Sequence, residues 1–277
     1  MKTAITNWSF HREITSGRMD IPKFLAEAGR LGYKAVELLS GWTNTPEQIQ
    51  DARSRADDLG LRVCCYGVSN DFCVTGSEMD AQVADVKRGI ETAVQLGAPV
   101  VRVFSGSRRK GMSFESARGM IVEGFYRIAP EAEAAGITMA MENHGRLAAT
   151  SEQVMRIIKS VGSSALKSTL DTGNFAIGDE DPVVAARNLA SQVAHVHVKD
   201  IAWDNVQGEG PQVFLSNAGR KLRPEVIGEG QIDFARIFRI LKKAGFSGHL
   251  SLEYEGNDPE PEAVARSTAH LMKLAGG

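Results

Sequence analysis

Five similar fragments recur along the chain, and they limit the fold more than any other feature of the sequence. Each fragment runs from the end of an amphipathic helix through a glycine into a short run of strand-forming residues. Glycine suits the left-handed residue that ends a helix, and the runs that follow are too short and too rich in Val, Ile and Leu to be helices. The fragments are AGRLGYKAVELL (28–39), ADDLGLRVCCYGV (56–68), AVQLGAPVVRVFSG (93–106), AEAAGITMAMENH (132–144) and LKKAGFSGHLSLEYE (241–255).

Three further segments have strand character, which brings the number of predicted strands to eight. They are TAITNWSF (3–10), LKSTLDTGN (166–174) and VAHVHVKD (193–200), and helical patterns separate all eight strands, with a last helix at about 260–275. Regular alternation favours a parallel sheet, and eight units in a chain of this length predict a closed (β/α)₈ TIM barrel. No linker or composition break appears, so we expect a single TIM-barrel domain over residues 1–277. A doubly wound open sheet is the competing fold, but the Gly-rich phosphate turn after the first strand is missing.

The composition limits the partners and the compartment. The formal net charge of −2 gives no electrostatic support for a nucleic-acid or membrane-surface partner. The N-terminal residues contain no apolar run long enough for a signal peptide, and no stretch approaches the roughly 20 apolar residues of a membrane span. The three cysteines are few, odd in number and clustered, which fits reduced thiols. We therefore expect a cytoplasmic protein that binds neither nucleic acid nor membranes; a homo-oligomer is one option that the sequence leaves open.

Polar side chains lie at the carboxyl ends of the last four predicted strands, where the active sites of such barrels are built. Successive residues of a strand point to opposite faces, so in HVHVKD the histidines and the lysine share the face opposite the valines. The same alternation places Glu142, Asp171, His197 and Glu253 inside the barrel at one mouth. His195 lies about two residues deeper on the same face, and we interpret it as a buried, hydrogen-bonded group.

Three carboxylates that face each other would repel and raise one another's pKa, and a divalent cation removes that conflict. Mixed carboxylate and imidazole ligands suit Mn²⁺, Mg²⁺, Co²⁺ or Zn²⁺. We therefore predict one divalent metal ion bound by Glu142, Asp171, His197 and Glu253, with Mn²⁺ as the first choice. The alternative is that these are unrelated polar strand ends, each satisfied by loops and water.

Six motifs resemble the xylose-isomerase-like TIM-barrel superfamily, the sugar phosphate isomerase/epimerase group. They are VELL (36–39), MENHG (141–145), LDTGN (170–174), HVHVKD (195–200), IGEGQIDF (227–234) and SLEYE (251–255), and the resemblance spans essentially the whole chain. It implies the same Glu, Asp, His, Glu metal site. In the ketose 3-epimerases of this group the two glutamates also form the acid/base pair, which here would make Glu142 and Glu253 catalytic.

Departures from the family patterns narrow this interpretation. Where the ketose epimerases carry a histidine three residues after the metal aspartate, this chain has Asn174. Where they carry an arginine six residues after the metal histidine, it has Trp203. Both departures argue against a D-tagatose 3-epimerase. The apurinic endonucleases of the same barrel need additional metal-binding histidines, and their Asp-x-His motif would fall on Leu222 and Pro224, so we exclude DNA repair.

Several other residues are candidates for substrate binding or for support of the site. We predict that His144, Asn174, Lys199, Trp203 and Arg223 bind substrate, although Lys199 and Arg223 could equally be solvated. Glu37 is a candidate to support the metal site, with helix capping as the alternative. The longest non-periodic stretch, about 201–231, follows the seventh strand, and we predict that it forms an active-site loop that closes over the substrate.

The sequence therefore predicts a metal-dependent isomerase or epimerase that acts on a sugar, a sugar phosphate or a related polyhydroxy carbonyl compound. The reaction would proceed by proton transfer through an enediolate. The first alternative is a lyase on the same scaffold, such as an inosose-type dehydratase or a keto-glycoside β-eliminase. The second is a sugar-binding subunit without catalytic activity.

Overall fold

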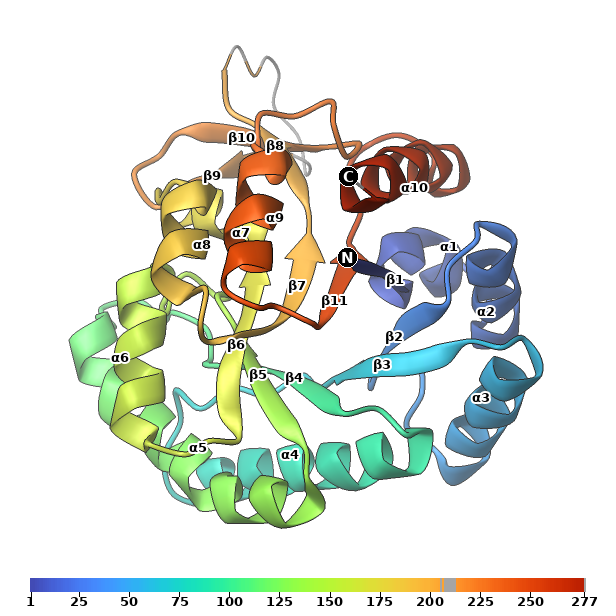
Figure 1. Cartoon of the computed structure of the whole chain (residues 1–277). Helices are drawn as coiled ribbons and strands as arrows, with labels where there is room; N and C mark the ends of the chain where they lie inside the picture. Colours follow the sequence, from blue (N-terminus) through green and yellow to red (C-terminus); the bar gives the residue numbers. More distant parts are fainter. Residues whose placement is uncertain (205, 207–212, 277) are drawn as a thin grey trace.

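The predicted barrel is confirmed: eight parallel strands close on themselves in the order β1-β2-β3-β4-β5-β6-β7-β11 (Figure 1). The structure, a computed structural model, describes residues 1–204, 206 and 213–276. The barrel strands are β1 (Lys2–Thr6), β2 (Ala35–Leu39), β3 (Arg62–Gly67), β4 (Val100–Phe104), β5 (Thr138–Glu142), β6 (Leu166–Asp171), β7 (Val193–Val198) and β11 (His249–Leu252).

Helices surround the barrel, as Figure 1 shows. They are α1 (His11–Thr15), α2 (Ile21–Arg30), α3 (Pro46–Asp58), α4 (Ser77–Leu96), α5 (Phe114–Ala135), α6 (Ser151–Val161), α7 (Thr172–Ile177), α8 (Pro182–Leu189), α9 (Phe234–Lys243) and α10 (Glu260–Gly276). The repeated glycines have the predicted role, because Gly97 and Gly136 end α4 and α5 in the left-handed conformation, with φ of 70° and 67°. Among the described residues, no helix combines the length and hydropathy that a membrane crossing requires.

The alternation of side chains along the strands is also as predicted. Val196 and Val198 of β7 and Met139 and Met141 of β5 are fully buried in the hydrophobic layer between strands and helices. The opposite face of β7 carries the histidines into the barrel. Asp171 pairs in register with His197, so neighbouring strands deliver their polar residues at the same height.

Two predicted strands are shorter than expected, because their last residues begin helices. Thr6 ends β1 and its hydroxyl accepts a hydrogen bond from the backbone N–H of Trp8, which starts the 3₁₀ helix η1 (Asn7–Phe10). Asp171 ends β6 and caps α7 through the backbone N–H of Asn174. A Thr or Asp residue can end a strand or cap a helix, so the residue type alone does not show where the strand stops and the helix begins.

The segment at 201–231 contains regular structure, which corrects its description as a non-periodic loop. The strands β8 (Asp200–Ala202), β9 (Phe214–Leu215) and β10 (Lys221–Glu225) form an antiparallel sheet in the order β8-β10-β9. In Figure 1 this small sheet lies beyond the end of β7. Gly208 and Gly210, which belong to the predicted closing loop, lie outside the described residues.

Asp200, the last residue of HVHVKD, ties this segment to the barrel. Its buried carboxylate accepts hydrogen bonds from the backbone N–H groups of Gly228 (2.8 Å), Gly230 (3.0 Å), Ile201 (2.9 Å) and Ile232 (3.3 Å). The motif IGEGQIDF therefore owes its fixed position to a side chain about thirty residues earlier in the chain.

Replacing Asp200 should be costly. We expect Asp200→Ala to lower the free energy of unfolding by about 3 kcal/mol, because it takes the acceptor from four backbone N–H groups, of which those of Ile201 and Ile232 are buried. Urea unfolding followed by circular dichroism measures this. Asp204→Ala is the matched control, since Asp204 is exposed and, among the described residues, its carboxylate accepts one bond, from the Gln231 side chain. A change above about 0.5 kcal/mol in Asp204→Ala, or no change in Asp200→Ala, would contradict this explanation.

Candidate active site

The structure brings the four predicted metal ligands together at the carboxyl ends of the strands. Nδ1 of His197 lies 3.5 Å from Glu142 Oε2, 3.9 Å from Asp171 Oδ2 and 3.5 Å from Glu253 Oε1. All four side chains are buried, and none is more than 7% exposed. We call this group of three carboxylates and one histidine the carboxylate cluster.

Asp171 is oriented by its place between a strand and a helix. Its Oδ1 accepts the backbone N–H of Asn174 at 2.9 Å and so caps α7, which leaves Oδ2 to face the cluster. Its backbone is fixed by Asn143, whose side chain accepts the N–H of Asp171 and donates to its C=O. In the LDTGN motif, one carboxylate oxygen of Asp171 therefore caps a helix and the other faces the site.

Glu37 binds the His197 ring on the side away from the other cluster residues, in the supporting role that the sequence suggested for it. Both of its oxygens lie 3.0 Å from His197 Nε2, and Oε2 also bonds His195 Nε2 and Ser251 Oγ at 2.9 Å. A carboxylate beside Nε2 keeps the proton on that nitrogen and leaves the lone pair of Nδ1 free to bind a metal. His195 is 1% exposed and hydrogen-bonded, as predicted.

Glu37→Gln should weaken metal binding about 10- to 100-fold, the usual effect of losing such a supporting partner. The amide can donate to Nε2, which shifts the proton of His197 to Nδ1 and blocks the lone pair. Competition with a chelating indicator measures the affinity. Ser251→Ala is the matched control, because it removes a hydrogen bond to the Glu37 carboxylate without moving the proton of His197. Equal losses of metal affinity in both variants would argue against the tautomer explanation.

Two cations lie inside the barrel beside the cluster. Lys199 is 3% exposed, and its ammonium lies 2.8 Å from Glu253 Oε2, 3.2 Å from Asp171 Oδ2 and 3.1 Å from Glu255 Oε2. Its stem passes over Gly173, where a Cβ would lie 2.7 Å from Lys199 Cδ. The alternative that Lys199 is a solvated strand end is therefore wrong.

Arg102 on β4 is the second cation, and the sequence reasoning missed it. Its Nε lies 3.3 Å from Glu142 Oε2, and its Nη1 donates to the carbonyl of Val68. The signal was present, because Arg102 alternates with the buried valines of VVRVF in the same way that Glu142 alternates with methionines. The other oxygen of Glu142 accepts a bond from Asn174 Nδ2 at 2.9 Å, which places Asn174 in the site.

The electrostatics of the cluster favour a bound cation. Burial raises the pKa of Asp171 to about 8, with Glu253 and Glu142 acting in the same direction and Lys199 against them. Burial lowers the pKa of His197, but the opposite effects of Glu37, Glu253 and Glu142 are larger together and raise this pKa to about 10. Without a metal at neutral pH, these pKa values place a proton on Asp171 and a second proton on His197, and a divalent ion bound there would displace both protons.

The ligand atoms of the cluster fit a metal site. Among the described residues, His197 Nδ1 is buried and has no hydrogen-bond partner, whereas the buried oxygens Asp171 Oδ2 and Glu253 Oε2 are ion-paired with Lys199 at 3.2 and 2.8 Å. Glu142, Asp171 and His197 each offer a ligand atom within 4.8 Å of the others. A buried imidazole nitrogen without a partner is rare, so its grouping with two carboxylates indicates a site for a ligand that has affinity for oxygen and imidazole.

Aromatic side chains surround the mouth of the site. The His144 ring is exposed and stacks on Phe104 with centroids 4.3 Å apart. Trp8 stacks on His11 and donates from Nε1 to Glu255, which in turn pairs with Lys199. Flat ring faces next to charged groups suit a polyhydroxylated substrate.

Among the described residues, the contacts of Trp203 and Arg223 are with residues other than the carboxylate cluster. The Arg223 guanidinium pairs with Glu225 at 2.7 Å, and Trp203 lies under the guanidinium of Arg220 at 5.5 Å from the ring centroid. The interactions that the structure describes for them join parts of the small sheet and its surroundings. Their role in substrate binding stays a prediction that depends on movement of this segment.

Comparison with known proteins identifies the class. The family model described as "Xylose isomerase-like TIM barrel" matches residues 25–274, so the chain belongs to this family. The L-ribulose 3-epimerase of Mesorhizobium japonicum is 26% identical over 283 residues, covering 96% of this chain and 86% of that protein. The inosose dehydratase of Clostridium perfringens is 26% identical over 155 residues, which cover 55% of this chain and 51% of that protein.

The solved structures agree on the fold. The probable 3-DHS dehydratase AsbF from Bacillus anthracis has a TM-score of 0.80 at 17% identity and covers 98% of this chain and 99% of that chain. The resemblance predicted from the motifs is thus confirmed. The chain is an enzyme of the sugar isomerase and epimerase family, either an isomerase or epimerase or a dehydratase.

Proposed function

We propose that this protein is a divalent-metal-dependent isomerase or epimerase of a sugar or a related polyhydroxy carbonyl compound. The observation that carries the proposal is the grouping of buried ligand atoms of Glu142, Asp171 and His197, from β5, β6 and β7, within 4.8 Å of one another. When bound there by Glu142, Asp171, His197 and Glu253, a divalent ion would polarise the substrate carbonyl and stabilise the enediolate. Mn²⁺ is our first choice among the ions that suit these ligands.

The glutamates are the candidates for proton transfer. Glu142 and Glu253 reach the site from strands on different sides, so one can remove the proton next to the carbonyl while the other serves the opposite side. Arg102 and Asn174 hold Glu142, and Lys199 holds Glu253. Both carboxylates are thereby kept in fixed orientations, as a positioned acid or base requires.

Lys199 favours one second candidate, a dehydratase. Its ammonium lies 2.8 Å from Glu253 Oε2, which occupies the oxygen that an epimerase would use as its second base. In a dehydration, a glutamate takes the proton next to the carbonyl, the C–O bond to the departing hydroxyl breaks, and Lys199 donates the proton that makes water. Similarity to inosose dehydratases supports this candidate from the sequence side.

A product screen tests both candidates. The wild-type protein is incubated with keto-sugars and keto-inositols with added Mn²⁺, and the products are analysed by mass. An unchanged mass with a new retention time indicates isomerisation or epimerisation, whereas loss of water indicates dehydration. Binding without turnover of any compound would favour the non-catalytic sugar-binding protein.

The segment around the small sheet should respond to substrate. If residues 201–231 close over the site, a substrate that turns over should slow backbone hydrogen exchange in β9 and β10 severalfold, because closure shields these edges. Peptides from α3, on the far side of the barrel, serve as the control. Unchanged exchange in β9 and β10 under saturating substrate would count against a closing segment.

A further inference from the structure

A second cavity opens at the other end of the barrel, where the strands begin. It has a volume of about 420 Å³ and is lined by residues that start β1, β3 and β11 and by the turn before β4. Lys2, Cys64, Pro99 and His249 also line an adjoining cavity of about 380 Å³ that continues under β7. None of the carboxylate cluster lines either cavity, so this basal pocket is distinct from the candidate active site.

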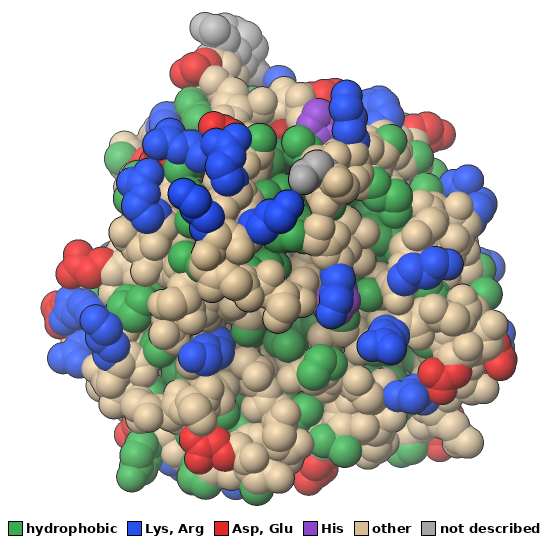
Figure 2. Space-filling view, viewed as in Figure 1, with side chains coloured by type: hydrophobic (Ala, Val, Ile, Leu, Met, Phe, Trp, Pro, Cys, Tyr) green, Lys and Arg blue, Asp and Glu red, His purple; other side chains and the backbone are tan. Residues whose placement is uncertain are grey.

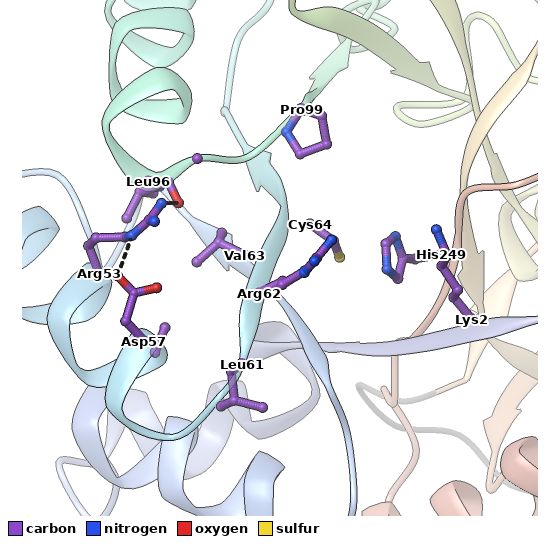
Figure 3. A pocket seen from close by; sticks show the side chains of 12 residues that line it. Lys2, Arg53, Asp57, Leu61, Arg62, Val63, Cys64, Leu96, Pro99 and His249 are labelled. Carbon is purple, nitrogen blue, oxygen red and sulfur yellow. Dashed lines mark hydrogen bonds and ion pairs between the residues drawn. The ribbon is translucent and has the colours of Figure 1, made fainter.

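Three basic side chains from three different strands meet at the basal pocket. Lys2 comes from β1, Arg62 from β3 and His249 from β11, and Figure 3 shows them following one another across the pocket. Lys2 and His249 are partners in the parallel register. In the part of the chain that the structure describes, no carboxylate lies within 4 Å of any of the three.

A fourth cation forms a rigid wall of the same pocket. Arg53 donates from Nε to Asp57 at 2.8 Å and from Nη1 to the carbonyl of Leu96 at 2.7 Å (Figure 3). Asp57 is the one acidic residue among those that line the pocket, and Arg53 neutralises it. The acidic residue of the pocket therefore does not neutralise Lys2 and Arg62, which make the pocket positive in a protein whose total formal charge is −2.

The positive charges at the pocket lie at its solvent-facing rim. Lys2 and Arg62 are exposed, His249 is half-buried, and β1 and β3 are not neighbours in the barrel. Burial lowers the pKa of His249 to about 4, and His195, Lys2 and Arg62 add to that effect. In the view of Figure 2, Lys and Arg side chains spread across the middle of the visible face, and most acidic side chains lie near its outline.

We infer that the basal pocket is a binding site for a small phosphate dianion, either free phosphate or the phosphate group of a small ester. Two permanent cations on opposite sides of a cavity match the two charges of such an ion, and the arginine can donate two parallel hydrogen bonds to phosphate oxygens. A tetrahedral anion can meet donors that approach from three strands, whereas a flat carboxylate meets fewer of them. Cys64 serves as wall only, since burial raises the pKa of its thiol well above the ordinary value.

Phosphate titrations of the whole protein test this inference. Binding of inorganic phosphate and of glycerol 2-phosphate is measured by calorimetry at constant ionic strength, together with the thermal stability in phosphate and in chloride. We expect one phosphate per chain in the wild type and at least about tenfold weaker binding in the double variant Lys2→Gln/Arg62→Gln. Binding of both compounds identifies an ester-type site, and binding of phosphate alone identifies a site for the free ion.

Two comparisons make the test specific. Lys23→Gln removes one exposed charge on α2 that lines neither cavity, and should leave phosphate affinity within about twofold of the wild type, as screened surface charges do. In chloride, the double variant should unfold within about 2 °C of the wild type, because it changes two exposed side chains. Equal phosphate affinity in the double variant and the wild type, or no binding by the wild type, would overturn the inference.

Discussion

Asp171→Asn should abolish stoichiometric metal binding while the barrel stays folded. We expect metal affinity to fall by more than about 100-fold, since even the loss of a supporting partner costs 10- to 100-fold. Asparagine can still cap α7 through its side-chain oxygen, so the N-terminus of that helix is preserved. Elemental analysis of protein purified without chelators measures the loss, and His197→Ala should show the same result.

Stability measurements separate this effect from damage to the fold. Without metal, Asp171→Asn should be at least as stable as the wild type, because the raised pKa of Asp171 means that burial disfavours its charged carboxylate. With metal at about 100 times its dissociation constant, the wild type should gain about 2.7 kcal/mol that the variant does not. Asp181→Asn is the matched control, since Asp181 caps α8 in the same way and lies outside the cluster. Full metal occupancy in Asp171→Asn and His197→Ala would remove the basis for the site.

The site could be predicted from the sequence because a barrel strand has strict alternation. Once the strand containing Val196 and Val198 is placed with its valines toward the helices, the position of His197 follows, and the same rule places Glu142 and Asp171. The rule also covers Arg102, where a charged residue between buried valines was overlooked. The barrel itself follows from local signals, since each glycine and capping residue acts within a few positions of itself.

Interactions between distant segments could not be predicted in the same way. Glu37 lies about 160 residues before the histidines that it contacts, and nothing local shows that one carboxylate serves both. The small sheet of β8, β9 and β10 is held by Asp200 through backbone N–H groups, which carry no sequence signature. Lys199 could be placed on the inward face, but its ion pairs depend on how β6 and β11 pack beside it.

The structure changes how the two glutamates are expected to act. Each has one oxygen that faces His197, and its other oxygen is held by Asn174 in Glu142 and by Lys199 in Glu253. Neither glutamate therefore has a carboxylate oxygen that is free of partners. A glutamate that takes a proton from the substrate must exchange one of these contacts for it.

Glu142→Gln and Glu253→Gln should each slow turnover by about 10²- to 10⁴-fold, the usual scale of acid–base catalysis. Glutamine keeps the shape of the side chain and removes the base. Metal content must be measured in both variants, so that loss of the ion is not taken for loss of the base. Glu255→Gln is the matched control, because Glu255 pairs with Lys199 at 3.1 Å and is not among the predicted ligands. A metal-loaded variant that turns over at the wild-type rate would exclude its glutamate as the base.

Solvent deuterium gives the sharper readout of the same chemistry. A proton removed by Glu142 or Glu253 can exchange with deuterated water before it returns, so deuterium should appear at the carbon next to the carbonyl in product or recovered substrate. A hydride that moves within the substrate never leaves it and would carry no deuterium. Because an elimination begins with the same proton removal, deuterium in recovered substrate together with loss of water would select the dehydratase. Turnover in the wild type with no deuterium uptake would contradict proton transfer in both proposed reactions.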